Sequence, residues 1–131
     1  MLEKIYQFLD EAETYYLATV EGDQPRVRPF GTILLFEEKL YIQTGTKKEV
    51  AKQIEQNNKV EICAFKDGSW LRLKGTLVKD DRRVIKEKML EKMPSLREMY
   101  NEDDGSMLML YFEKGDATIS SFTKPVEVII F

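Results

Sequence analysis

The sequence predicts an α+β fold in which an antiparallel β-barrel forms the core and short helices are inserted between the strands. Three observations predict this class: about seven runs are rich in β-branched and aromatic residues, short turn segments join most of them, and the remaining segments repeat apolar residues at helical spacing. Most connections are too short for the crossover helices of a parallel βαβ fold. The 131 residues suit one domain, so we expect a single domain over 1–131.

The first half of the chain changes from a helical period to an extended one and back. Apolar residues at helical spacing open the chain, and the aromatic and β-branched run Tyr15–Val20 follows. Turn residues separate the extended runs, and Val50, Ala51 and Ile54 share one face of a later helix. The elements expected here are a helix over 2–13, strands over 15–20, 26–36 and 39–44, and a helix over 47–56.

The second half contains the strongest turn signal, Asp67-Gly68-Ser69, which predicts a hairpin. Asp80 or Asp81 is expected to cap a helix that stops or kinks near Pro94, and Ser95-Leu96-Arg97-Glu98 fits the capping box of one more short helix. The strands expected here cover 60–66, 70–79, 107–112, 117–122 and 126–131, with a flexible loop over 100–105.

The composition excludes several chemistries. The chain has no histidine, which excludes Ser-His-Asp and Cys-His catalysis and every histidine-ligated metal site. A single cysteine, Cys63, excludes intrachain disulfides and zinc ribbons, and we expect it to be buried in a strand without a chemical role. We therefore expect no metal site, and any redox chemistry must come from a bound organic cofactor.

Charge and hydropathy argue against nucleic-acid and membrane partners. The net charge is −3, so a nucleic-acid-binding barrel that uses Arg26, Arg28 and the basic segment 82–92 is disfavoured. The longest charge-free stretches fall far short of the roughly 20 apolar residues that a membrane helix needs. The N-terminus has no basic region followed by an apolar one, so we expect a cytoplasmic protein.

The segment Thr44-Gly45-Thr46-Lys47-Lys48 places two lysines at the positive end of a helix dipole. Each such cation costs a few tenths of a kcal/mol, roughly, when no anion is bound there. A phosphate would gain from free helix N–H groups, two hydroxyls and two ammonium groups. The alternative is a capping box between Thr46 and Glu49, with both lysines in solvent. The spacing leaves both interpretations open.

Two further segments carry candidate ligand contacts. Strand alternation places Arg26, Arg28 and Phe30 on one face, and Pro29 restricts this strand to an edge or a bulge. A planar heteroaromatic molecule with a phosphate would suit that face, although an ordinary exposed polar face has the same pattern. Trp70 faces the same side as Arg72 and opposite to Leu71, so it can stack on a ligand, anchor a subunit interface or lie at the rim of the core.

Four motifs follow one another in a fixed order: Tyr16–Val20, Gln24-Pro25-x-x-Arg28, Leu40–Gly45 with Lys47-Lys48, and Gln53–Val60. This succession resembles that of the pyridoxamine-phosphate-oxidase-like flavin-binding split barrels. The C-terminal part, with Gly115-Asp116-Ala117-Thr118 and a closing Val-Glu-Val-Ile-Ile-Phe, is similar to the short bacterial branch related to nitroimidazole-resistance (Nim) proteins.

The resemblance implies a homodimer with two FMN sites in clefts between the subunits. It places Arg28 where the family has a phosphate- or flavin-contacting arginine, and Phe30 where the backbone runs beside the isoalloxazine ring. It places Trp70 where a side chain of the partner subunit approaches the flavin. The residues that it aligns with the phosphate-gripping turn are Thr44, Thr46, Lys47 and Lys48.

The departures from the family narrow the expected activity. Ile33 stands where the vitamin-forming oxidases have a second phosphate-binding lysine, and their C-terminal substrate-binding extension is missing, so oxidation of pyridoxamine phosphate is not expected. The active-site histidine of the nitroimidazole-resistance relatives is also absent, and no catalytic residue stands out. We expect an FMN-dependent oxidoreductase that takes electrons from a reduced nicotinamide cofactor and reduces a small acceptor. The alternative is a non-enzymatic module that binds or senses flavin or haem on the same barrel.

Overall fold

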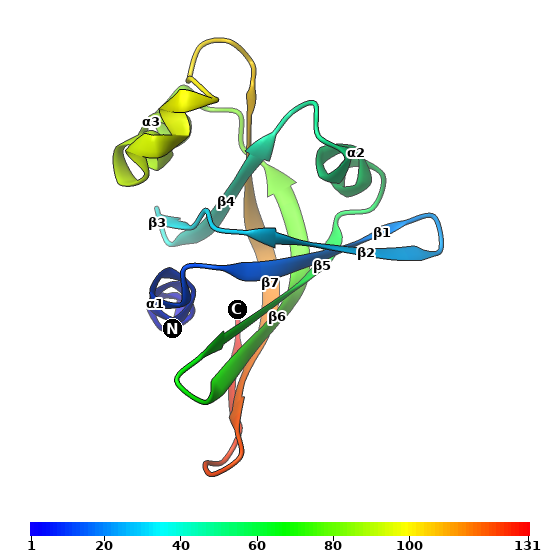
Figure 1. Cartoon of the computed structure of the whole chain (residues 1–131), viewed down its shortest axis with the longest axis vertical. Coiled ribbons are helices and arrows are strands. Elements are labelled where there is room, and N and C mark those ends of the chain that lie inside the picture. Colours follow the sequence, from blue (N-terminus) through cyan, green and yellow to red (C-terminus); the bar gives the residue numbers. More distant parts are fainter.

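The computed structural model describes all 131 residues. The strands form one curved antiparallel sheet, and helices lie around it. Figure 1 shows the β1–β2 ribbon crossing the long β6–β7 pair, with α1, α2 and α3 placed around the sheet. The helices are α1 (Leu2–Ala12), α2 (Glu49–Gln56) and α3 (Arg83–Lys92), and the 3-10 helix η1 (Pro94–Glu98) follows α3. The strands are β1 (Tyr15–Glu21), β2 (Gln24–Phe30), β3 (Leu34–Phe36), β4 (Lys39–Gly45), β5 (Lys59–Lys66), β6 (Ser69–Lys79), β7 (Met107–Ser121) and β8 (Glu127–Ile130).

The strand order is β2-β1-β5-β6-β7-β4-β3, with β8 paired to β7, and every pairing is antiparallel. The expected α+β class with an open, split barrel is therefore confirmed. The sheet bends where β6 and β7 come unusually close: a Cβ on Gly75 would lie 2.2 Å from the carbonyl oxygen of Lys114, so a side chain does not fit there. A register shift follows between Thr76 and Leu77.

Two separate cores lie on the two faces of β4 and β7. The larger one, of 22 buried residues, includes Ile5, Leu17, Ile42 and Leu73 and is covered at one end by α2 through Val50, Ala51 and Ile54. The smaller one lies under α3 and consists of seven residues: Leu34, Tyr41, Ile85, Met89, Leu90, Met107 and Met109. Because β4 is packed on both faces, the turn that leaves it toward α2 is held in a fixed position.

Two strand predictions are wrong in detail. The expected strand over 26–36 is two strands, because the chain leaves the sheet at 31–33, where Thr32 accepts a hydrogen bond from the Tyr15 hydroxyl at 2.7 Å. The expected strands over 107–112 and 117–122 are parts of one strand, β7. Glu113 to Asp116 is no turn: Gly115 exchanges two backbone hydrogen bonds with Phe131, at 3.1 and 2.9 Å, and β6 pairs alongside.

The capping predictions near α3 are also wrong. Arg82 occupies the N-cap of α3 and no side chain caps the helix, because Asp80 accepts hydrogen bonds from Arg82 and from the Tyr41 hydroxyl instead. Ser95 and Glu98 lie in η1, which begins at Pro94 and has no side-chain cap. The helix before it ends at Lys92, as the proline requires.

Cys63 is exposed, which corrects the expectation that it is buried. Its neighbours Ile62 and Ala64 point into the core, so the alternation of β5 turns the thiol outward.

No helix of the structure is both long and apolar enough to span a bilayer.

A polar cluster fixes the start of α3 to the sheet. Asp80 accepts from the Tyr41 hydroxyl at 2.7 Å and from Arg82 Nε and Nη2 at 3.0 and 2.9 Å, and Arg82 also donates to Glu37 at 2.6 Å. The Asp80 side chain is only 10% exposed. The Arg82 guanidinium, with the Tyr41 hydroxyl, lowers the pKa of Asp80 from 3.8 to about 2.

We predict that Asp80→Asn lowers the free energy of unfolding at pH 7 by about 2 kcal/mol, because the ionised form is favoured in the folded protein. The stabilisation that the ionised Asp80 carboxylate contributes is complete at pH values above its ordinary pKa of 3.8. It is lost as the pH falls through about 2, and about half of it remains at pH 3. Urea unfolding at both pH values measures it. Asp23→Asn, at an exposed residue without an ion pair, is the control. A difference that grows on acidification would contradict the assignment.

Candidate functional site

The turn between β4 and α2 keeps an open helix N-terminus. Lys48 is the N-cap residue of α2, and no side chain caps the first turn. The Thr46 hydroxyl donates to the Gly105 carbonyl at 2.8 Å, so the capping box with Glu49 does not form. Lys47 and Lys48 are exposed and have no carboxylate within 4.0 Å. The positive end of the helix and two ammonium groups thus remain available to an anion.

The structure separates the four residues of the expected phosphate-gripping turn into two groups. Thr46, Lys47 and Lys48 lie together in the turn and line a cavity of about 320 Å³. Thr44 lies within β4 opposite Leu108 and is 4% exposed. The exposed part of the turn therefore begins at Thr46.

The other wall of this cavity is a segment that the sequence did not connect with the turn. Tyr100, Asp104, Gly105 and Ser106 complete the lining. The first pair of the β4–β7 ladder, Gly45 with Met107, brings this loop to the turn. Gly45 makes room for the Tyr100 ring, since a Cβ there would lie 3.1 Å from the Tyr100 hydroxyl oxygen.

Asp104 adds a negative charge to the cavity, but its carboxylate is engaged within the loop. It accepts hydrogen bonds from the Ser106 N–H at 2.9 Å and from the Asn101 amide at 3.0 Å. Hydrogen bonds from Ser106 hold the pKa of Asp104 below its ordinary value. Only the loop pattern of 100–105 was visible in the sequence, and nothing in it indicated which element the loop contacts.

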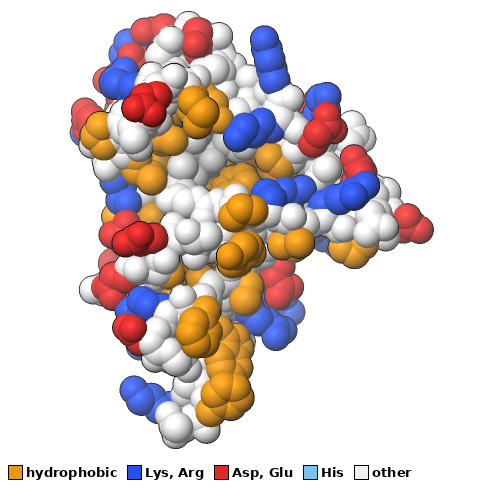
Figure 2. All heavy atoms as spheres, viewed as in Figure 1, with side chains coloured by type: hydrophobic (Ala, Val, Ile, Leu, Met, Phe, Trp, Pro, Cys, Tyr) orange, Lys and Arg blue, Asp and Glu red, His pale blue; other side chains and the backbone are white.

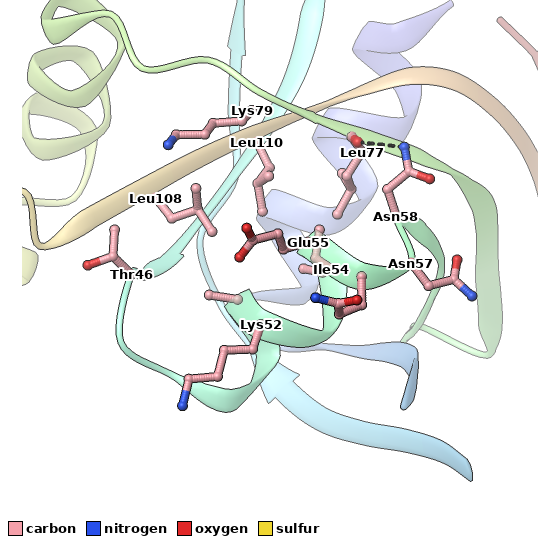
Figure 3. Close-up of a pocket in the computed structure, with 12 residues that line it drawn as sticks. Thr46, Lys52, Ile54, Glu55, Asn57, Asn58, Leu77, Lys79, Leu108 and Leu110 are labelled. Atoms are coloured by element: carbon pink, nitrogen blue, oxygen red, sulfur yellow. Dashed lines mark hydrogen bonds between the residues drawn. The ribbon is translucent and has the colours of Figure 1, made fainter. Parts of the chain in front are cut away.

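A larger cavity of about 560 Å³ adjoins the turn at Thr46 and lies between α2 and the β6–β7 pair. In Figure 3, Leu108 and Leu110 of β7 point into it, while the ammonium groups of Lys52 and Lys79 turn away. At its far end Asn58 donates to the Leu77 carbonyl at 3.1 Å. No sequence pattern indicated this cavity, because its walls come from three separate segments.

Arg28 lies on the edge strand β2 and is bound only by neutral acceptors. Its Nη1 donates to the Leu17 carbonyl at 3.2 Å and to the Thr19 hydroxyl at 2.8 Å, and its Nη2 donates to Gln53 Oε1 at 2.6 Å. The other five arginines each form an ion pair, and Arg28 forms none. Burial lowers the pKa of Arg28, and the nearby Arg26 adds to this effect.

The predicted arrangement of β2 is confirmed. Arg26, Arg28 and Phe30 pair with Thr19, Leu17 and Tyr15, whose side chains face the core, and β2 is the edge strand that Pro29 requires. The Phe30 ring lies 5.9 Å from that of Tyr15, measured between centroids.

Trp70 lies far from the turn within the same chain. It pairs with Ser120 of β7, whereas Thr44 pairs with Leu108, so the two positions are separated by roughly 40 Å along β7 if the strand is taken as straight. The Trp70 ring packs on Phe122 at a centroid distance of 5.2 Å. A single chain therefore does not bring Trp70 to Lys47 and Lys48.

The outer face of the sheet exposes apolar side chains. Figure 2 shows hydrophobic atoms along the β1–β2 ribbon and further down the sheet. We call this surface the outer apolar face and define it by Tyr16, Val27, Phe65, Phe122, Val128 and Ile130, which are 51 to 91% exposed. Large exposed apolar patches on a protein surface are typical of interaction sites.

No group of three or more cysteine, aspartate or glutamate side chains lies close enough to hold a metal ion. The turn offers two exposed ammonium groups at the open start of α2, and Arg28 is a partly buried guanidinium bound to Gln53 in the second turn of the same helix. The cavities beside it have volumes in the range of small-molecule sites, roughly 300–1,000 Å³.

The sequence model of the pyridoxamine 5′-phosphate oxidase family matches residues 1–114 of this chain. A NimC/NimA family protein from Clostridium acetobutylicum is 49% identical, with a TM-score of 0.92 over 97% of this chain and 92% of that one. No curated protein matches the sequence significantly.

Two more distant structures share the fold alone. A pyridoxamine 5′-phosphate oxidase-related, FMN-binding protein from Nostoc punctiforme is 16% identical, with a TM-score of 0.67 over 99% of this chain and 94% of that one. A haem-binding protein from Mycobacterium smegmatis is 11% identical, with a TM-score of 0.70 over 93% of this chain and 57% of that one.

Proposed function

Because the chain belongs to the pyridoxamine 5′-phosphate oxidase family, and within it to the NimC/NimA group, we propose that it binds FMN and acts as an oxidoreductase. Its electron donor is a reduced nicotinamide cofactor, and its acceptor is a small molecule. The observation that carries the proposal is the uncapped start of α2 with the exposed Lys47 and Lys48, together with Arg28, which is bound to the same helix through Gln53 and has no carboxylate partner.

These residues fit the phosphate of FMN. A phosphate ester carries close to two negative charges and accepts several hydrogen bonds, which the α2 N–H groups, the two ammonium groups and the guanidinium supply. Thr46 would border the phosphate and Phe30 the flavin ring, whereas the burial of Thr44 removes it from direct contact. When bound, FMN supplies hydride and electron transfer, and the protein supplies binding, orientation and electrostatics.

The proposed active form is a homodimer in which the outer apolar face meets a second copy of the chain. Exposed apolar residues on four of the eight strands, β1, β2, β5 and β8, together with Phe122 just after β7, support this face as the contact. A dimer also gives Trp70 a role that one chain does not allow, because the Trp70 of one subunit can approach the flavin of the other.

Pyridoxamine phosphate is not the proposed substrate. Ile33, which stands in place of a phosphate-binding lysine, is 2% exposed and belongs to the larger core. A haem-binding role has less support than flavin binding, because the haem-binding neighbour shares only the fold, at 11% identity. Oxidation of a reduced nicotinamide by the FMN-loaded protein, followed in the presence of quinone and nitroaromatic acceptors, separates an oxidoreductase from a flavin-storing module.

We predict that Lys47→Glu combined with Lys48→Glu weakens FMN binding by at least about tenfold, because two attractive charges next to the phosphate become repulsive. Quenching of flavin fluorescence on titration measures the dissociation constant. The control combines Lys88→Glu on α3 with Lys114→Glu on β7, which changes the net charge of the protein by the same amount. Unchanged affinity in the Lys47 and Lys48 variant would remove the turn from the phosphate site.

We predict that light scattering gives twice the chain mass of 15.3 kDa. Val128→Lys combined with Ile130→Lys is expected to yield a monomer, because two charges would be buried at the contact. The control Val84→Lys, on α3, tests whether a lysine introduced at any exposed apolar position dissociates the dimer. A dimer that survives both β8 substitutions would show that the subunits meet elsewhere.

A further inference from the structure

We propose that Gln53 is a positioning residue that holds Arg28 as an uncompensated cation, so that the site selects a phosphate monoester over the same ligand without its phosphate. The inference rests on the proposed function, because it assigns a specificity determinant to that site. Gln53 lies in the second turn of α2 and is 7% exposed.

The hydrogen bonds around Gln53 fix the guanidinium in place. Gln53 Oε1 accepts from Arg28 Nη2 at 2.6 Å and from the Thr19 hydroxyl at 2.6 Å. The same hydroxyl accepts from Arg28 Nη1 at 2.8 Å. Thr19 is 1% exposed, so its hydrogen bonds with Arg28 and Gln53 are shielded from water. Networks of this kind hold a side chain in one orientation.

The same bonds leave the positive charge of Arg28 unneutralised. All three acceptors, two uncharged side-chain oxygens and the Leu17 carbonyl, are neutral. Three of the five guanidinium N–H donors are used, which leaves Nε–H and one N–H on Nη2 without an acceptor in the chain. Two such donors on one guanidinium can bind two oxygens of one phosphate.

The nearest carboxylate of the network, that of Glu21, forms no ion pair with Arg28, although its charge acts on the guanidinium. Glu21 forms an ion pair with Arg26 at 2.9 Å and contacts the Gln53 amide nitrogen at 3.5 Å. Gln53 therefore presents its oxygen to Arg28 and its NH₂ group to Glu21, and it stands between the two charges. A glutamate at position 53 has nearly the same shape and would pair directly with Arg28.

The cluster is joined through α2 to the turn that carries the two lysines. Gln53 follows the N-cap Lys48 by five residues, which is about 7.5 Å along the axis of α2. The proposal takes Arg28 and the start of α2 to contact the same ligand.

The test compares FMN with riboflavin, which has the same ring and lacks the phosphate. In the wild type we expect FMN to bind at least about a hundredfold more tightly, since each charge-assisted contact is worth roughly a factor of ten or more. Gln53→Glu is expected to reduce this preference at least about tenfold and to leave riboflavin binding unchanged. Gln7→Glu, at an exposed position of α1, adds the same charge outside the cavities and away from Arg28 and should keep the preference.

A second variant guards against misfolding. Gln53→Leu removes the acceptor without adding a charge, so it should lower FMN affinity several-fold and leave riboflavin affinity unchanged, with the fold followed by circular dichroism. If the wild type does not prefer FMN over riboflavin, the proposed phosphate site itself is wrong. If the wild type prefers FMN and a folded Gln53 variant keeps that preference in full, the role of Gln53 is overturned.

Discussion

The site depends on one buried contact, the hydrogen-bonded triangle of Gln53, Thr19 and Arg28 that joins α2 to the β1–β2 hairpin. α2 has only eight residues and no side-chain cap, so it would be marginal as an isolated helix. Its apolar face, with Val50, Ala51 and Ile54, gives it a place on the larger core, but apolar packing alone does not fix rotation or register. The polar triangle does so, and it leaves a cation bound at the second turn of the helix.

The rest of the fold keeps this helix start open. β4 is packed on one face by the larger core and on the other by the core under α3, so the turn that follows Gly45 has little freedom. The cluster of Asp80, Arg82 and Tyr41 fixes α3 to the sheet, and the loop after η1 reaches the turn through the pairing of Gly45 with Met107. Two lysines at the positive end of a helix cost free energy in the absence of an anion. A rigid scaffold can maintain such an arrangement, as many binding sites require.

Much of this could be predicted from local sequence patterns, and the failures share a cause. Alternation placed Arg28 and Phe30 on one face of an edge strand, and helical spacing found α2, because both signals are local. Glu113 to Asp116 looked like a turn, yet two neighbouring strands keep it extended. The cap of α3 was misassigned because Asp80 bonds to Tyr41, 39 residues away. Gln53 stood only within a motif of the family resemblance and Tyr100 only within an expected loop. Their roles were not visible, since they arise from contacts between segments far apart in the chain.

The central claim is that this chain holds a flavin through its phosphate, and one measurement tests it most directly. The purified protein is mixed with excess FMN, desalted, and its visible absorption spectrum recorded, with riboflavin treated identically. The account predicts flavin bands that remain with the protein at close to one FMN per chain, and almost no retained riboflavin. A colourless protein after mixing with FMN would contradict the account and direct attention to a different ligand on the same fold.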